Sequence, residues 1–223
     1  MSDVGISDSA AWGIVATLIA ILVAAFAGAF LVGSVPFGIV IGRLFYGTDI
    51  RKQGSGNIGA MNALRTLGKG GAIAVLILDA LKGFAPVMCV ALLTRWMDRD
   101  IQQVLLAVIA TGAVLGHCYS PWLRFKGGKG VATSFGAIFA LCWPAGLVAV
   151  GGWILGASAT RFSSVGSMLG SVFAPIAIWF FCRSVPEAAY GVFAALLILF
   201  KHRENIARIR AGTEGPIRLS KNA

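Results

Sequence analysis

Charged residues are scarce in this chain: 13% of its 223 residues are Asp, Glu, Lys or Arg, and 57% are hydrophobic. A soluble domain carries about a quarter of its residues as charges, so this composition excludes one. The remaining charge is mostly positive, with 19 Lys and Arg against 9 Asp and Glu. In so apolar a chain we expect that excess in cytoplasmic loops, not on a nucleic-acid surface. We therefore predict one polytopic membrane domain over residues 1–223, with no nucleic-acid partner.

Cysteine is scarce too, and none of the spacings is typical of a metal site among Cys89, Cys118, Cys142 and Cys182. We expect buried free thiols, no bound metal and no cofactor. Lys and Arg are absent before Arg43. The first apolar stretch therefore lacks the basic flank of a cleaved secretory signal, and we expect it to stay as a membrane anchor.

Apolar runs long enough to cross about 30 Å of hydrocarbon recur along the chain. The expected spans are residues 12–32, 70–94, 101–117, 166–182 and 186–200, with one or two more in 130–159. Residues 33–46 contain Pro36 and are too short for an ordinary crossing, so we predict an interfacial or re-entrant segment. Residues 47–69 are predicted to be a long polar connection.

Lys and Arg decide whether residues 130–159 cross once or twice, because cytoplasmic loops carry the excess. Two crossings, broken around Trp143 and Pro144, put fifteen Lys and Arg inside and three outside, whereas one crossing puts nine on each side. We therefore predict an all-α integral membrane protein of about seven transmembrane helices, tilted or locally thinned around Pro144. The N-terminus is outside, the C-terminus is cytoplasmic, and the polar segments share an active site at the cytoplasmic face.

The segment FKGGKG, residues 125–130, is short, basic and rich in glycine. Glycines let backbone N–H groups approach an anion, a helix N-terminus that follows adds its positive dipole, and lysines add charge. We interpret the segment as a phosphate cradle; the alternative is a basic cytoplasmic turn. It is not a nucleotide-binding P-loop, because Lys129 is followed by Gly130, not by Ser or Thr.

Two further polar segments offer ligands for a phosphate or a polyol. GSGNIGAMNALR, residues 54–65, places hydroxyl, amide and guanidinium groups among glycines; the alternative is a flexible connector. HRENIARIRAGTE, residues 202–214, places His202 and Asn205 on one face if it is helical; the alternative is a basic tail that anchors the chain to the membrane. Asp79 and Lys82, three apart in an expected span, are predicted to be a structural ion pair, the alternative being a proton or ion pathway.

In this order the segments resemble the acyl-phosphate:glycerol-3-phosphate acyltransferase family, PlsY. The resemblance covers residues 33–214 and rests on GSGNIGAMNALRTLGK, DALKG, GHCYSPWLRFKGGKGVATSFG, RFSSVGS and HRENIARIRAGTE. Met61 departs from it, since a small polar residue such as Thr is expected there.

The resemblance implies transfer of a fatty acyl group from acyl phosphate to the sn-1 hydroxyl of glycerol 3-phosphate. The products would be lysophosphatidic acid and phosphate, in bacterial phospholipid biosynthesis. We expect a monomer in the lipid bilayer of the bacterial inner membrane, with an acyl-phosphate-producing enzyme as a partner. The competing class is a transporter of anionic phosphorylated solutes, which would show an inverted repeat that is not apparent here.

Each polar segment contributes candidate site residues. The expected catalytic residues are Ser55, Arg65, Lys129, His202 and Asn205. The expected substrate-binding residues are Gly54, Gly56, Asn57, Asn62, Lys126, Gly127, Gly128, Gly130, Ser163 and Ser164. The expected structural residues are Asp79, Lys82 and Glu214, the last holding the tail through a basic neighbour. The proton acceptor is His202 or a substrate phosphate, and no Ser-His-Asp pattern supports a covalent acyl-enzyme.

Overall fold

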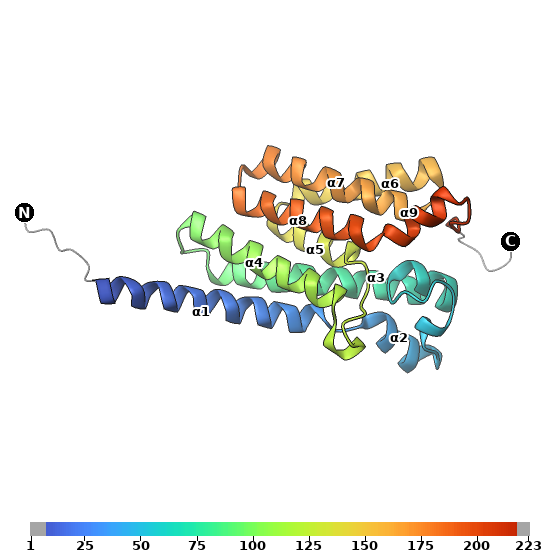
Figure 1. Cartoon of the computed structure of the whole chain (residues 1–223), viewed down its shortest axis with the longest axis horizontal. Coiled ribbons are helices and arrows are strands. Elements are labelled where there is room, and N and C mark those ends of the chain that lie inside the picture. The colour runs from blue at the N-terminus through green and yellow to red at the C-terminus, as the bar shows by residue number, and fades with distance from the viewer. Residues whose placement is uncertain (1–7, 218–223) are drawn as a thin grey trace, which may run out of the picture.

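The computed structural model describes residues 8–217, and every regular element in that range is helical (Figure 1). The α-helices are α1 (Asp8–Gly33), α2 (Phe37–Tyr46), α3 (Ala60–Leu93), α4 (Arg99–Cys118), α5 (Val131–Leu141), α6 (Trp143–Thr160), α7 (Ser163–Cys182), α8 (Val185–Lys201) and α9 (Arg203–Arg210). Two 3-10 helices, η1 (Ile50–Lys52) and η2 (Pro121–Leu123), lie in connections. The predicted all-α class is confirmed for this range.

Several of these helices are long and apolar enough to cross a membrane. Within residues 8–217 there are four such segments, or five if α8 and α9, which meet at a bend of 51°, form one span. The four are Ala11–Tyr46, Ala60–Leu93, Arg99–Leu123 and Ser163–Cys182. The number of seven spans, their orientation and the membrane position of α2 stay predictions.

The polar connection before α3 is shorter than expected. We predict a connection over residues 47–69, but a helical segment already begins at Ala60 and meets the rest of α3 at a kink at Gly68, where the backbone is not helical (φ 81°). Ala63 and Leu67 explain the early start, because they lie one helical turn apart and are both buried in the same hydrophobic cluster. The predicted break in residues 130–159 is present at Cys142, and Pro144 occupies the first turn of α6, where its missing N–H costs no hydrogen bond.

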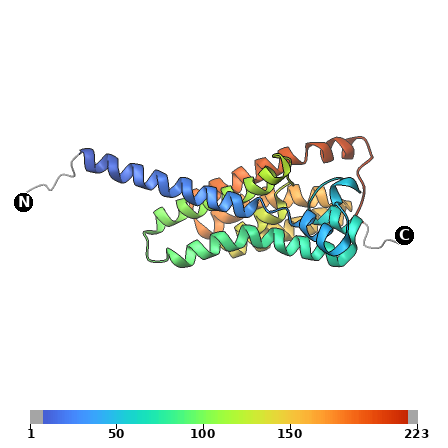
Figure 2. The same cartoon turned by 90° about the horizontal axis from the view of Figure 1, so that it is seen from below.

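The long helices form one bundle with distinct ends. In both views α1 extends beyond the bundle at one end (Figures 1 and 2). At the opposite end lie α2, the connection into α3, α9 and the turn between α6 and α7. Polar segments that are far apart in the sequence therefore gather at one end of the molecule.

Glycines let two helices of the bundle approach until their backbones touch. A Cβ atom at Gly136 of α5 would lie 2.0 Å from the carbonyl oxygen of Ala80 on α3. A Cβ atom at Gly83 of α3 would lie equally close, 2.0 Å, to the carbonyl oxygen of Thr133 on α5. Such contacts between small residues are the usual means of helix association in lipid, where the hydrophobic effect does not drive it.

The cysteine prediction is wrong for three of the four residues. Cys142 and Cys182 form a disulfide, and Cys89 is an exposed free thiol, whereas Cys118 is free and buried as expected. The disulfide partners are 40 residues apart in the sequence. They meet because α6 and α7 form an antiparallel hairpin, an arrangement that cysteine spacing alone does not reveal.

Replacing Gly136 by Ala is expected to destabilise the protein, because the added Cβ forces α5 and α3 apart. Overpacking of this kind costs about 1–3 kcal/mol, which would appear as a lower thermal unfolding midpoint in detergent. Gly151→Ala is the matched control, because Gly151 is also helical and a Cβ atom added there would meet no other atom within 4 Å. An equal midpoint for the two variants would contradict the backbone contact.

Candidate anion-binding site

The glycine-rich segment, residues 125–130, folds back onto the end of α4. Gly127 donates its N–H to the carbonyl of Cys118 at 3.2 Å, and Gly128 donates to the carbonyl of His117 at 3.0 Å. Gly130, with φ 82°, then leads directly into α5. The backbone therefore holds Lys129 beside the N-terminus of α5, where the helix dipole favours negative charge.

Lys129 contacts the C-terminal part of the chain. Its ammonium donates to the Oδ1 atom of Asn205 on α9, and the Nδ2 atom of Asn205 donates to Oε1 of Glu214 at 2.6 Å. The same Oε1 accepts a hydrogen bond of 2.8 Å from the hydroxyl of Ser164, at the start of α7. The glycine-rich segment, α7, α9 and the tail are thus connected by one chain of hydrogen bonds.

Two arginines complete this polar cluster. Arg208 donates from Nε to Oε2 of Glu214 at 2.7 Å, which supplies the basic neighbour expected for that carboxylate. Arg65, near the start of α3, donates from Nη2 to the carbonyl of Gly215 at 3.3 Å. Glu214 is the carboxylate bonded within this cluster, and the negative charge of Glu204 also acts on Lys129, so the three cations Lys129, Arg65 and Arg208 exceed two carboxylates by one positive charge.

These surroundings change the acid–base behaviour of two groups. Burial, followed by the positive charge of Arg208, lowers the pKa of Lys129 to about 8, although the negative charges of Glu214 and Glu204 oppose this shift. Burial favours a higher pKa for Glu214, but the hydrogen bonds from Asn205, Arg208 and Ser164 outweigh it and hold that pKa below its ordinary value. Glu214 is therefore ionised at neutral pH, and Lys129 is charged but close to its titration range.

His202 lies at the bend between α8 and α9, three residues before Asn205 of this cluster. Its side chain is buried, and its Nδ1 atom lies 2.8 Å from the carbonyl oxygen of Ile198. A carbonyl oxygen only accepts hydrogen bonds, so Nδ1 carries a proton. In the neutral ring, the Nε2 atom is then left as a hydrogen-bond acceptor.

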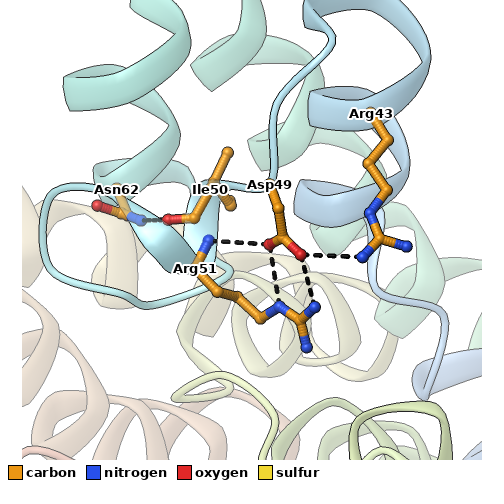
Figure 3. A network of polar contacts seen from close by, with 5 residues as sticks. All are labelled: Arg43, Asp49, Ile50, Arg51 and Asn62. Carbon is orange, nitrogen blue, oxygen red and sulfur yellow. Dashed lines mark hydrogen bonds and ion pairs between the residues drawn. The ribbon is translucent and has the colours of Figure 1, made fainter.

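The glycine-serine segment, residues 54–65, is organised by Asn62. Its Nδ2 atom donates to the carbonyl of Ile50 at 2.7 Å (Figure 3). The same atom donates to the carbonyl of Asn57 at 2.8 Å, and Oδ1 accepts from the N–H of Ser55 at 2.8 Å. Gly54 and Gly56 have φ values of 58° and 70°, which favour glycine. The side chain of Asn62 is therefore fully used in shaping the segment that presents Ser55.

A pair of salt bridges, which the sequence did not suggest, lies just before this segment and is called the Asp49 clamp below. Asp49 forms ion pairs with Arg43 at 2.9 Å and with Arg51 at 2.6 Å (Figure 3). The hydrogen bonds from Arg51 hold the pKa of Asp49 far below its ordinary value, although burial opposes the shift. The Asp49 clamp fixes the connection between α2 and α3.

The structure brings together some of the expected site residues and separates others. Arg65, Lys129, Ser164, Asn205 and Glu214 are joined by direct contacts or through the tail backbone, as described above. Ser55 and Lys126 are exposed, and the contacts of Asn57 and Ser163 are local, with Gly59 and Ser167. Asp79 and Lys82 form the expected ion pair at 2.7 Å inside the bundle. Arg208 and His117 were missed, because basic tails and single histidines are common in membrane proteins.

A helical bundle with apolar outer faces carries a partly buried lysine among arginines, beside a helix N-terminus, at one end. These features are typical of a membrane protein that handles an anionic, phosphate-like group at one end of its bundle.

Comparisons with known proteins identify the family. Residues 15–212 match the family model described as glycerol-3-phosphate acyltransferase. The chain is 43% identical over 188 residues to the glycerol-3-phosphate acyltransferase of Synechococcus sp. strain JA-3-3Ab, covering 84% of this chain and 89% of the relative. It is also similar to crystal structures of PlsY (YgiH), an integral membrane glycerol 3-phosphate acyltransferase. The glycerol 3-phosphate form has a TM-score of 0.79 at 33% identity, and the lysophosphatidic acid form 0.76 at 32%, each covering 91% of this chain and 96% of the other.

The chain therefore belongs to the glycerol-3-phosphate acyltransferase family. It is an integral membrane acyltransferase of the PlsY type.

Proposed function

We propose that the protein transfers a fatty acyl group from acyl phosphate to the sn-1 hydroxyl of glycerol 3-phosphate. The observation that carries this proposal is the position of Lys129, which lies beside the N-terminus of α5 and is held by Asn205 and, through it, by Glu214. The glycerol 3-phosphate and lysophosphatidic acid forms of the related PlsY support the choice of substrate and product.

Two phosphate groups take part in this reaction, and the site has the charge to hold them. Glycerol 3-phosphate is a dianion near neutral pH, and acyl phosphate is also anionic. Lys129 and Arg65 supply cations, and the N-terminus of α5, which directly follows Gly130, adds its positive dipole. Such preorganised donors stabilise the charge that develops as phosphate leaves.

The chemical step is a direct acyl transfer. The sn-1 hydroxyl oxygen attacks the carbonyl carbon of acyl phosphate, a new ester C–O bond forms, and the C–O bond to phosphate breaks. The phosphate departs with the bonding electrons, and the hydroxyl proton passes to a base. Acyl phosphate is already activated, so positioning of the two substrates supplies much of the acceleration, about 7 kcal/mol or more in well-oriented reactions.

The base is His202 or a phosphate oxygen of a substrate. Neutral His202 fits this role, because its Nδ1 proton is directed to Ile198 and leaves Nε2 as the acceptor. A covalent acyl-enzyme at Ser164 is not favoured, because the hydroxyl of Ser164 donates to Glu214, not to a histidine. Ser55 and Asn205 would orient the glycerol and the acyl phosphate.

The cellular setting belongs to the same proposal. The enzyme would lie in the bacterial inner membrane with seven spans, the N-terminus outside and the site at the cytoplasmic face. It would act as a monomer, because one chain supplies all the site residues. An enzyme that makes acyl phosphate would supply the donor.

Acyl transfer by the purified protein tests this function directly. Glycerol 3-phosphate is offered with acyl phosphate, acyl-CoA or acyl carrier protein in parallel, and lysophosphatidic acid is measured. We expect product from acyl phosphate alone, and about a hundredfold loss or more in folded Lys129→Ala, since removing one charge-stabilising donor costs about 10²–10³-fold. Formation of product from acyl-CoA alone would contradict acyl phosphate as the donor. A protein that binds glycerol 3-phosphate but forms no product from any donor would favour the transporter instead.

The pH dependence follows from the lowered pKa of Lys129, about 8. Below this pH the ammonium is charged and binds phosphate; above it the free enzyme loses that charge. We therefore expect kcat/KM for glycerol 3-phosphate to fall as the pH rises through about 8, because kcat/KM reports groups of the free enzyme. Lys129→Arg keeps its charge at high pH, so the residual kcat/KM of this variant should not fall as the pH rises through about 8. An unchanged fall in the variant would assign the pH dependence to another group.

A further inference from the structure

A cluster of buried charges lies inside the bundle, outside the residues that hold the substrates in the proposed function. Lys82 and Asp79 form an ion pair of 2.7 Å, and Nδ1 of His117 on α4 lies 3.6 Å from the same oxygen of Asp79. All three side chains are at most 4% exposed. Apolar residues of similar size often replace a buried ion pair without loss of stability, so folding alone gives little reason for this one.

The His117 residue supports the glycine-rich segment directly. Its carbonyl accepts the N–H of Gly128 at 3.0 Å, and its imidazole lies against the Cα of the same glycine. A Cβ atom at Gly128 would lie only 2.0 Å from Nε2 of His117. The ring is buried and lies beside Asp79, so it has little freedom to move aside.

The ion pair also connects this support to the break between α1 and α2. The ammonium of Lys82 donates to the carbonyl of Val35 at 2.7 Å and lies 5.6 Å from the ring centre of Phe37. Asp79 therefore contacts the Lys82 cation, which is held by the break after α1 and lies over Phe37 of α2, and it also lies beside the His117 ring on α4. The cluster can therefore fix the position of the His117 ring relative to α2, α3 and α4.

We propose that His117, held by Asp79 and Lys82, is a positioning residue that sets the distance of the glycine-rich segment from the end of α4, and so the position of Lys129. This inference rests on the proposed function, because it assumes that the segment binds a substrate phosphate. Lys129 directly follows Gly128, so a displaced Gly128 displaces the cation. A displacement of about 1 Å in such a site can cost about 10²-fold in rate.

A double-mutant cycle tests the contact between Gly128 and His117. Gly128→Ala alone should lower kcat/KM for glycerol 3-phosphate by about 10²-fold, because its methyl group meets the ring. In the Gly128→Ala/His117→Ala protein the methyl group has space, so we expect about tenfold of that loss to be regained, within the range of coupling between contacting residues. His117→Asn provides a second, milder background, because it keeps an N–H donor near Asp79 but opens the space under Gly128.

Gly116→Ala is the matched control. Its Cβ would lie 2.1 Å from the carbonyl oxygen of Phe30 on α1, a comparable clash that truncation of His117 does not relieve. We expect no recovery in Gly116→Ala/His117→Ala. If His117→Ala restored activity to Gly116→Ala as well as to Gly128→Ala, the bundle would have loosened in general, and the inference would be overturned. It would also be overturned if the losses from Gly128→Ala and the His117 substitution simply added, both for His117→Ala and for His117→Asn.

The role of the ion pair is tested by removing both charges together. Asp79→Leu/Lys82→Met should keep the thermal unfolding midpoint near that of the wild type, but raise KM for glycerol 3-phosphate more than it lowers kcat. A merely structural pair predicts unchanged KM in the folded variant, and that result would overturn the inference. Wild-type protein without acyl transfer would instead refute the proposed function, so the two failures are distinguishable.

Discussion

The site depends on the carboxylate of Glu214. Its two oxygens accept hydrogen bonds from Ser164, Asn205 and Arg208, and Asn205 in turn receives the ammonium of Lys129. Without this negative charge, the cations around Lys129 would repel one another in a partly buried space, where charges interact more strongly than in water. With it, they stay together and keep the positive charge that the proposed phosphate site requires.

The bundle makes this arrangement possible by holding its backbones close together. Helices α3 and α5 touch through Gly83 and Gly136, which fixes the start of α5, and hence Lys129, relative to the part of α3 that follows the kink at Gly68. On the other side of the site, the ammonium of Lys201 donates at 3.0 Å to the carbonyl of Cys118, which also accepts the N–H of Gly127. The end of α8, which bears His202, is thereby joined to the end of α4. An enzyme that works on a water-soluble dianion and a lipid needs a fixed cluster of polar side chains at one end of an apolar bundle.

The sequence predicts the parts of this structure that depend on local composition. Apolar runs locate the long helices, Pro144 marks the start of α6, and the motifs of residues 54–65, 125–130 and 202–214 indicate the polar segments that meet at one end. What it does not predict depends on contacts between distant residues. The disulfide of Cys142 and Cys182 follows from the α6–α7 hairpin, and the support of Gly128 by His117 follows from a turn after α4. Asn62 also appears in the sequence as one more polar ligand, and only its hydrogen bonds to Ile50, Asn57 and Ser55 show that it shapes the segment instead.

The most direct test of this account is an experimental structure of the protein with glycerol 3-phosphate bound. The account predicts that the phosphate lies within hydrogen-bond distance, about 3 Å, of Nζ of Lys129. It also predicts that Glu214 keeps its contacts with Asn205 and Arg208. A phosphate bound midway through the bundle, beside Asp79 and Lys82 and away from Lys129, would contradict the account and indicate a path across the membrane.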